Sequence, residues 1–190
     1  HGYLTFKGQN RLTSVSELFD NNAVLFSNVD WTRTRAYGLG LGNIYINLAG
    51  REPQGIVLPG KEYDALRAEL KQGLEAIVDP ANGEKPVYRV YNREDMYSGF
   101  NPAPIPDMRV ANAPNYRVSW QTSLGGAPDQ LIQDNLEPWS GDHCSLDPKF
   151  VPGIYFDSMA GAPDEPNMMD LAPSILSYFK LKPAQKMDGR

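Results

Sequence analysis

The fold is decided largely by residues 34–48, which read Thr34-Arg35-Ala36-Tyr37-Gly38-Leu39-Gly40-Leu41-Gly42-Asn43-Ile44-Tyr45-Ile46-Asn47-Leu48. Two apolar and aromatic runs, 34–41 and 43–48, are split at Gly42-Asn43. Such runs favour strands, and a glycine-containing connection between them is typical of a β-hairpin. The segment Gly50-Arg51-Glu52-Pro53 ends the second run. We therefore expect a strand pair at this point in the chain.

An amphipathic helix is predicted after the hairpin. Pro59-Gly60 opens it, and Asp79-Pro80 and Asn82-Gly83 end it. Its apolar side chains recur at steps of three and four, which places them on one face: Tyr63, Leu66, Leu70, Leu74 and Ile77. Charged and polar side chains fill the opposite face. The pattern predicts a half-buried helix with a solvated charged side.

Further strands are predicted beyond this helix. Residues 85–92 alternate between two faces, and residues 108–110 and 116–120 predict two more strands among the prolines. Residues 121–150 predict a long irregular loop, and loops of that length are usually functional or disordered. Near the N-terminus, residues 12–19 predict a short helix.

The C-terminal part predicts a strand and a helix. The apolar run Val151-Pro152-Gly153-Ile154-Tyr155-Phe156 indicates a short strand. Asp170 is expected to cap the final helix, because its carboxylate can accept hydrogen bonds from free backbone N–H groups. The expected buried side of this helix comprises Leu171, Ile175, Leu176 and Phe179. The order of elements predicts the mixed α/β class, or α+β for the chain as an isolated piece.

Composition limits the possible partners. The chain has 190 residues, 41% of them hydrophobic and 22% charged, which is typical of a globular protein. A net charge of −5 argues against binding to a nucleic-acid polymer, which requires a basic surface. No apolar run reaches the roughly 18 residues that a membrane span needs. The single cysteine, Cys144, excludes an internal disulfide and a cysteine-rich zinc site.

One of the two histidines lies in a segment that predicts a loop. His143 belongs to Trp139-Ser140-Gly141-Asp142-His143-Cys144, which is polar, contains glycine, and is flanked by Pro138 and Pro148. Metal and phosphate chemistry is often placed at a histidine on a loop between buried elements. The alternative is a solvent-exposed histidine with no ligand.

Several strings occur in a definite order along the chain. They are Val29-Asp30-Trp31-Thr32-Arg33-Thr34-Arg35-Ala36-Tyr37-Gly38-Leu39-Gly40, residues 43–57, Ala103-Pro104-Ile105-Pro106-Asp107-Met108, Ser140-Gly141-Asp142-His143-Cys144, Pro152-Gly153-Ile154, Asp170-Leu171-Ala172-Pro173-Ser174-Ile175-Leu176 and Met187-Asp188-Gly189-Arg190. Together they resemble the bacterial type I phosphodiesterase/nucleotide pyrophosphatase family of the alkaline phosphatase superfamily. The resemblance covers most of the chain, and the order of the strings is more specific than any one of them.

The resemblance implies an alkaline-phosphatase-like α/β/α sandwich with an inserted α+β subdomain. Residues 1–29 would belong to the N-terminal part of a truncated core, 30–138 to the inserted subdomain, and 139–190 to a C-terminal core segment. The family uses two divalent metal ions, usually zinc, and a Thr or Ser nucleophile to hydrolyse phosphoric diesters or anhydrides. In such sites one ion lowers the pKa of the attacking oxygen and the other stabilises the leaving oxygen.

On this resemblance His143 matches a metal ligand. The nucleophile and most other ligands match nothing in this chain, so no catalytic or cofactor-binding residue is assigned to it. His1-Gly2-Tyr3 resembles either the end of the family's Asp-His-Gly motif or, as the spacing favours, a later Gly-Tyr-Leu segment. One imidazole does not hold zinc at useful affinity. We therefore expect a C-terminal fragment that is inactive alone and holds no zinc, or only incidental zinc.

The implied substrate of the parent enzyme is a phosphodiester or nucleotide-like small molecule, and localisation stays open, a secreted or periplasmic parent included. The alternative is a self-contained, non-catalytic α+β binding or interaction module.

Other residues have open roles. Asp142 would orient the imidazole or be an exposed acid, and Cys144 is expected to be incidental. Asp30, Arg33 and Arg35 favour a salt-bridged start of a strand over a phosphate site. The tyrosines at 37, 45, 88, 91 and 97 favour ordinary strand positions over a nucleobase platform.

Overall fold

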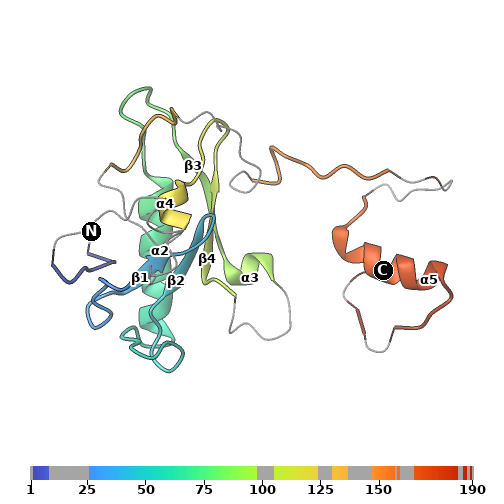
Figure 1. Ribbon diagram of the computed structural model, residues 1–190, viewed down its shortest axis with the longest axis horizontal. Coiled ribbons are helices and arrows are strands. Elements are labelled where there is room, and N and C mark those ends of the chain that lie inside the picture. The colour runs from blue at the N-terminus through green and yellow to red at the C-terminus, as the bar shows by residue number, and fades with distance from the viewer. Residues whose placement is uncertain are drawn as a thin grey trace. The chain divides into compact units, whose positions relative to one another are not determined.

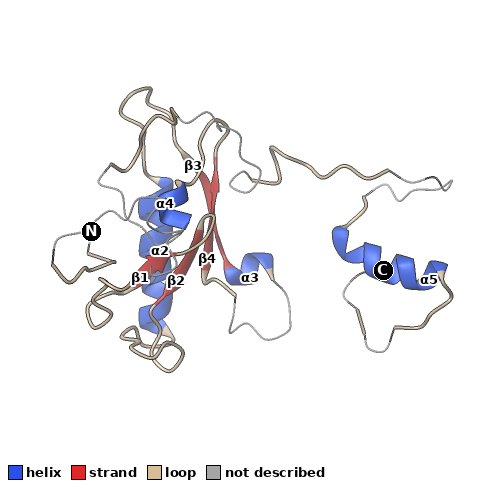
Figure 2. Cartoon of the chain, in the orientation of Figure 1, coloured by secondary structure: helices blue, strands red, loops and turns tan. Residues whose placement is uncertain are grey.

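The computed structural model describes residues 2–8, 26–97, 105–123, 130–136, 147–156, 158, 165–183, 186–187 and 189. The chain divides into two compact units, His1–Val151 and Pro152–Arg190, and each has its own description below. The first unit is a mixed α/β structure built on one antiparallel sheet (Figures 1 and 2). The predicted class is confirmed at this level.

The sheet of the first unit has four strands in the order β1-β2-β4-β3. Their bounds are β1 (Ala36–Gly38), β2 (Asn43–Ile46), β3 (Val87–Asn92) and β4 (Met108–Asn112). Every neighbouring pair is antiparallel, and the register places Tyr37 opposite Tyr45 and Tyr91 opposite Arg109. The β1–β2 connection turns at Gly42, which has a φ of 83°. A Cβ at that position would lie 2.7 Å from the Val110 carbonyl oxygen, so the turn requires glycine.

Helix α2 (Lys61–Glu75) packs on one face of this sheet. It buries Tyr63, Leu66 and Leu70, the first three residues of the predicted apolar stripe. Acidic residues in its first turn, Glu62 and Asp64, suit the positive end of the helix dipole. The core between helix and sheet is formed by Ala36, Ile46, Val57, Tyr63, Leu66, Leu70, Val87, Val90 and Met108.

The outer edge of β1 is covered by the N-terminal segment. The Tyr3 carbonyl accepts hydrogen bonds from the N–H groups of Arg35 (2.8 Å) and Ala36 (3.1 Å). The Tyr3 hydroxyl donates to Glu69 on α2 at 2.7 Å. The segment at residues 2–8 is therefore held to both the sheet and the helix.

Most predicted elements of this unit are confirmed, and one is wrong. The hairpin, the long helix and the strands at 85–92 and 108–110 are present with altered ends. Residues 116–119 form no strand, and residues 120–123 form the short helix α4 (Trp120–Ser123). The chain turns at Asn115, which has a φ of 72°, and residues 116–119 after this turn pair with no strand of the described sheet.

The second unit contains a 3₁₀ turn, η1 (Met168–Asp170), followed by α5 (Leu171–Tyr178). Asp170 does not cap α5, which corrects the prediction. Its Oδ2 instead accepts from the Asn167 N–H at 3.2 Å, while the Asn167 Oδ1 accepts from the Met169 N–H at 3.0 Å. Asn167 is thus the capping residue, and the helical segment begins earlier than predicted.

No described residue of the second unit is buried. The predicted strand at 151–156 is wrong, because these residues have no regular secondary structure. The predicted buried side of the last helix is not covered by the described residues of this unit, since Ile175 is 57% exposed and Phe179 is 65% exposed. A strand needs a neighbouring strand and an apolar face needs a covering surface, and the described part of this unit supplies neither.

Some predictions fall outside the described residues. The helix expected at 12–19 is among them. The boundary predicted between residues 138 and 139 stays a prediction. Among the described helices, none has the length and apolar character required to cross a membrane.

Candidate functional site

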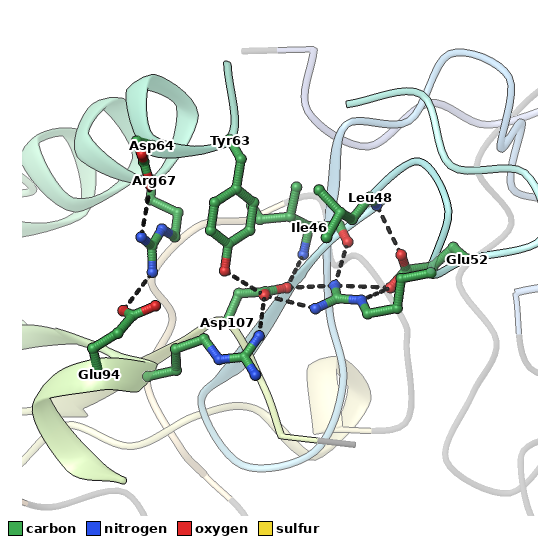
Figure 3. A network of polar contacts seen from close by, with 10 residues as sticks. Ile46, Leu48, Glu52, Tyr63, Asp64, Arg67, Glu94 and Asp107 are labelled. Atoms are coloured by element: carbon green, nitrogen blue, oxygen red, sulfur yellow. Dashed lines mark hydrogen bonds and ion pairs between the residues drawn. The ribbon is translucent and has the colours of Figure 1, made fainter. Parts of the chain in front are cut away.

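A buried carboxylate, that of Asp107, is the centre of the main polar site in the first unit (Figure 3). Its side chain is fully buried, with 0% exposure. Arg51 donates from Nη1 to Oδ1 at 2.8 Å and from Nη2 to Oδ2 at 2.6 Å. The Tyr63 hydroxyl donates to Oδ1 at 2.7 Å, the Ile46 N–H to Oδ2 at 2.7 Å, and Arg93 Nη1 to Oδ1 at 3.4 Å. Five hydrogen bonds therefore converge on one carboxylate.

Asp107 and the three side chains that bind it come from four parts of the fold. Asp107 immediately precedes β4, and Arg51 lies in the turn after β2. Tyr63 is in the first turn of α2, and Arg93 begins α3 (Arg93–Met96), directly after β3. The backbones of these two residues are also joined, because the Arg93 N–H donates to the Asp107 carbonyl at 3.0 Å. The carboxylate therefore ties the ends of three strands to the start of the long helix.

The electrostatics favour an ionised Asp107. Burial on its own would raise the pKa of this carboxyl, but the hydrogen bonds from Arg51, Ile46 and Tyr63 outweigh it and lower the pKa. The bond to Asp107 raises the pKa of Arg51 in return. Burial, followed by the bond to Asp107, raises the pKa of Tyr63 to about 12. The site is thus a charged pair with a neutral phenol at neutral pH.

Three more carboxylates lie on either side of the Asp107 network (Figure 3). Glu52 accepts from Arg51 Nε at 2.9 Å and from the Leu48 N–H at 2.8 Å, which fixes the turn after β2. On the other side, Arg67 of α2 bridges Glu94 at 2.6 Å and Asp64 at 2.9 Å. The ion pair between Arg67 and Glu94 holds α3 to α2.

This arrangement is suited to holding the fold together. Both oxygens of Asp107 already accept hydrogen bonds from protein donors, and a carboxylate offers about four lone-pair sites. A metal ion or a substrate proton would have to displace those donors. The site therefore positions loops and carries no acid–base or ligand chemistry of its own.

A second buried carboxylate, Asp147, attaches the segment at 147–150 to β3. It is 3% exposed. Its Oδ2 accepts from the Tyr91 hydroxyl at 2.6 Å, and its Oδ1 accepts from the Lys149 N–H at 2.8 Å. Lys149 Nζ donates to the Tyr88 hydroxyl at 3.0 Å. The bond to Asp147 raises the pKa of Tyr91.

His143 and its neighbours Asp142 and Cys144 lie outside the described residues, so their predicted roles stay predictions. Among the residues that the structure does describe, no group of three or more His, Cys, Asp or Glu side chains could hold a metal ion. Asp147, four positions after His143 in the sequence, is the nearest described residue on its C-terminal side.

The charged residues before β1 have local structural contacts. Asp30 Oδ1 accepts from the Thr32 N–H at 3.1 Å and from its hydroxyl at 2.7 Å, which closes a turn. Arg35 lies 4.0 Å from Glu69 across a solvent-exposed ion pair. The Arg33 carbonyl accepts from the Thr5 hydroxyl at 3.3 Å. These contacts agree with the preferred interpretation of a charged strand start.

The tyrosines do not form one platform across the sheet. Tyr37 and Tyr45 stack with ring centroids 5.4 Å apart, and Trp31 and Phe26 meet the Tyr37 ring edge-on at 5.0 and 5.5 Å. Burial raises the pKa of Tyr37 to about 12. Tyr37 is thus part of an aromatic cluster on the face of the sheet opposite the core.

Comparison with known proteins identifies no family. No family model matches the chain, and no curated protein or solved structure matches it significantly.

The sequence interpretation missed the roles of Arg51, Asp107 and Asp147. The first two lie in the quoted strings Gly50-Arg51-Glu52-Pro53 and Ile105-Pro106-Asp107-Met108, and neither string indicates a contact between them. One signal was available: Asp107 directly precedes a predicted strand, where a carboxylate requires a partner if it is buried. Nothing in the sequence identifies Arg51 as that partner.

Proposed function

We propose that the chain is the C-terminal part of a metal-dependent phosphodiesterase or nucleotide-pyrophosphatase-like hydrolase. The ordered set of strings from Asp30 to Arg190 carries this proposal, because the strings and their order resemble those of that family. In the proposed parent the chain belongs to an alkaline-phosphatase-like sandwich and supplies His143 as one zinc ligand. The nucleophile and the remaining ligands come from other parts of the parent.

One contact in the fold supports treating the strings as a unit. Arg51 and Asp107 belong to two separate strings, and they form a bidentate ion pair with N–O distances of 2.8 and 2.6 Å. Two strings that build one buried site depend on each other physically, so their joint occurrence has a structural reason. This pair supports the integrity of the proposed inserted subdomain and takes no part in the chemistry.

The second unit supports membership of a larger fold. Several of its large apolar side chains are more than half exposed, including Ile154 (81%), Phe156 (90%) and Tyr178 (72%). Apolar surface of this density is usually covered in a native protein. A C-terminal core segment of a sandwich would bury these side chains against the parent's sheet.

The proposed function is tested by expressing the longest reading frame that contains the chain. That frame should encode a Thr or Ser nucleophile motif upstream and should hydrolyse bis-p-nitrophenyl phosphate with added zinc. His143→Ala should lower turnover by orders of magnitude, and Glu84→Ala, at an exposed acid, should leave it unchanged. Unchanged turnover in the His143 variant would remove this residue from the metal site.

The second candidate is a self-contained, non-catalytic binding module. The first unit favours it, because the unit has its own apolar core and an internal polar network around Asp107. A reading frame that starts at or just before His1 would favour this candidate. A longer frame with a nucleophile motif would favour the hydrolase.

A further inference from the structure

Strand β3 forms one edge of the four-stranded sheet. In an antiparallel pair, alternate residues direct their N–H and C=O groups toward the neighbouring strand and away from it. The Arg93 N–H reaches the Asp107 carbonyl at 3.0 Å, and Tyr91 lies opposite Arg109. The N–H groups of Val90 and Asn92 consequently point away from β4.

Carboxylates from two different helices occupy these outward donors. The Val90 N–H donates to Glu75 Oε1 of α2 at 2.8 Å. The Asn92 N–H donates to Asp95 Oδ2 of α3 at 3.0 Å. Two successive edge donors are thus satisfied by side chains, where another strand would otherwise place its carbonyl groups.

The same edge is open to solvent. A hollow of about 510 Å³ lies beside it and is lined by Lys71, Glu75, Arg89, Tyr91 and Asp95. The strand itself reads Val-Tyr-Arg-Val-Tyr-Asn, and most of these residue types favour sheets. An accessible edge of this composition is a template for pairing with another strand unless it is blocked.

We propose that Glu75 and Asp95 guard the edge of β3 against pairing with β3 of a second copy of this chain. Antiparallel pairing of two identical strands is self-complementary and closes at two copies. In the native chain, one side-chain oxygen of Glu75 and one of Asp95 fill the outward donors of β3, so these donors do not pair with another copy. When these acceptor oxygens are removed, the two sheets join into one.

The test combines hydrogen exchange with a measurement of mass. In the native chain, the amides of Val90 and Asn92 should exchange at least about tenfold more slowly than in an unstructured chain. In a Glu75→Ala/Asp95→Ala variant both amides should lose this protection at low protein concentration. At high concentration the variant should regain it as its mass rises from 21.1 kDa toward twice that value.

Two further variants separate capping from net charge. Glu75→Gln/Asp95→Asn keeps an acceptor oxygen at each site and should behave like the native chain. Glu84→Ala/Glu165→Ala removes two exposed acids elsewhere and should also leave the mass unchanged. The proposal is overturned if both amides exchange freely in the native chain. It is also overturned if the alanine variant keeps its native mass at every concentration, or if all three variants associate equally.

Discussion

Substitution of Asp107 with asparagine tests the buried network most severely. The amide has nearly the same size, but it carries no charge, and its NH₂ group faces donors. Arg51 and Arg93, whose side chains are 18% and 14% exposed, would lose their buried anion. Removing one partner of a buried ion pair costs about 3–5 kcal/mol. Because whole domains are stable by roughly 5–15 kcal/mol, the variant should lose a large part of its free energy of unfolding.

Urea unfolding followed by circular dichroism measures this loss. The midpoint should fall strongly while the dependence of the free energy on urea stays near that of the native chain. The matched control is Asp64→Asn, because that carboxylate is 64% exposed in its ion pair with Arg67 and should contribute less than about 1 kcal/mol. A loss below about 1 kcal/mol for Asp107→Asn would refute the argument that this carboxylate holds the fold together.

Acid pH provides a second check on the same residue. The folded-state pKa of Asp107 is lowered, so its contribution to stability is complete above the unfolded pKa of about 4. The contribution is then lost as the pH falls through the folded-state pKa. The native chain should therefore lose stability in acid faster than Asp107→Asn does. If the free energies of unfolding of the two chains fell equally as the pH was lowered, the lowered pKa of Asp107 would be contradicted.

Three further predictions concern Tyr63, Tyr91 and a pair of glycines. The pKa of Tyr63 is raised to about 12 in the folded chain. The contribution of its phenol to the free energy of unfolding is therefore complete below pH 10 and is lost as the pH rises to 12. The native chain should lose free energy of unfolding in urea between pH 10 and 12, and Tyr63→Phe should make this loss smaller by about 2–3 kcal/mol. An equal loss in both chains would contradict the raised pKa of Tyr63. Tyr91→Phe should cost about 1–3 kcal/mol and speed amide exchange at Lys149, because it leaves buried Asp147 short of a donor. Tyr97→Phe, at a side chain that is 48% exposed, should change neither the stability nor the exchange at Lys149. Equal effects of the two substitutions would argue against a stabilising Tyr91–Asp147 hydrogen bond. Gly42→Ala should cost about 1–3 kcal/mol because of its positive φ and the nearby Val110 carbonyl. Gly73→Ala, in open space on α2, should raise the melting temperature. If Gly42→Ala stabilised the chain and Gly73→Ala destabilised it, the β1–β2 turn would not require glycine at position 42.

The elements with strong periodicity could be predicted from the sequence, and those that depend on distant partners could not. The α2 stripe and the hairpin at Gly42 follow from local spacing, and both are confirmed. The strand expected at 116–120 is wrong: the chain turns at Asn115, where φ is 72°, and residues 116–119 have no regular secondary structure. The strand expected at 151–156 failed because apolar composition alone supplies no neighbouring strand.

The candidate site illustrates the same limit. Arg51 and Asp107 lie 56 positions apart, and no local pattern links a turn arginine to a carboxylate before a later strand. Only the folded sheet brings them together, since β2 and β4 are neighbours there. The quoted strings contain both residues, and the fold determines what they contact.

We propose that this chain supplies one metal-ligating imidazole, that of His143, to a larger phosphodiester hydrolase. Measuring zinc per polypeptide, together with turnover of bis-p-nitrophenyl phosphate, in the longest reading frame with and without His143→Ala tests it most directly. The account predicts that the variant loses bound zinc and that its turnover falls by orders of magnitude. Full zinc content and native turnover in the variant would contradict it.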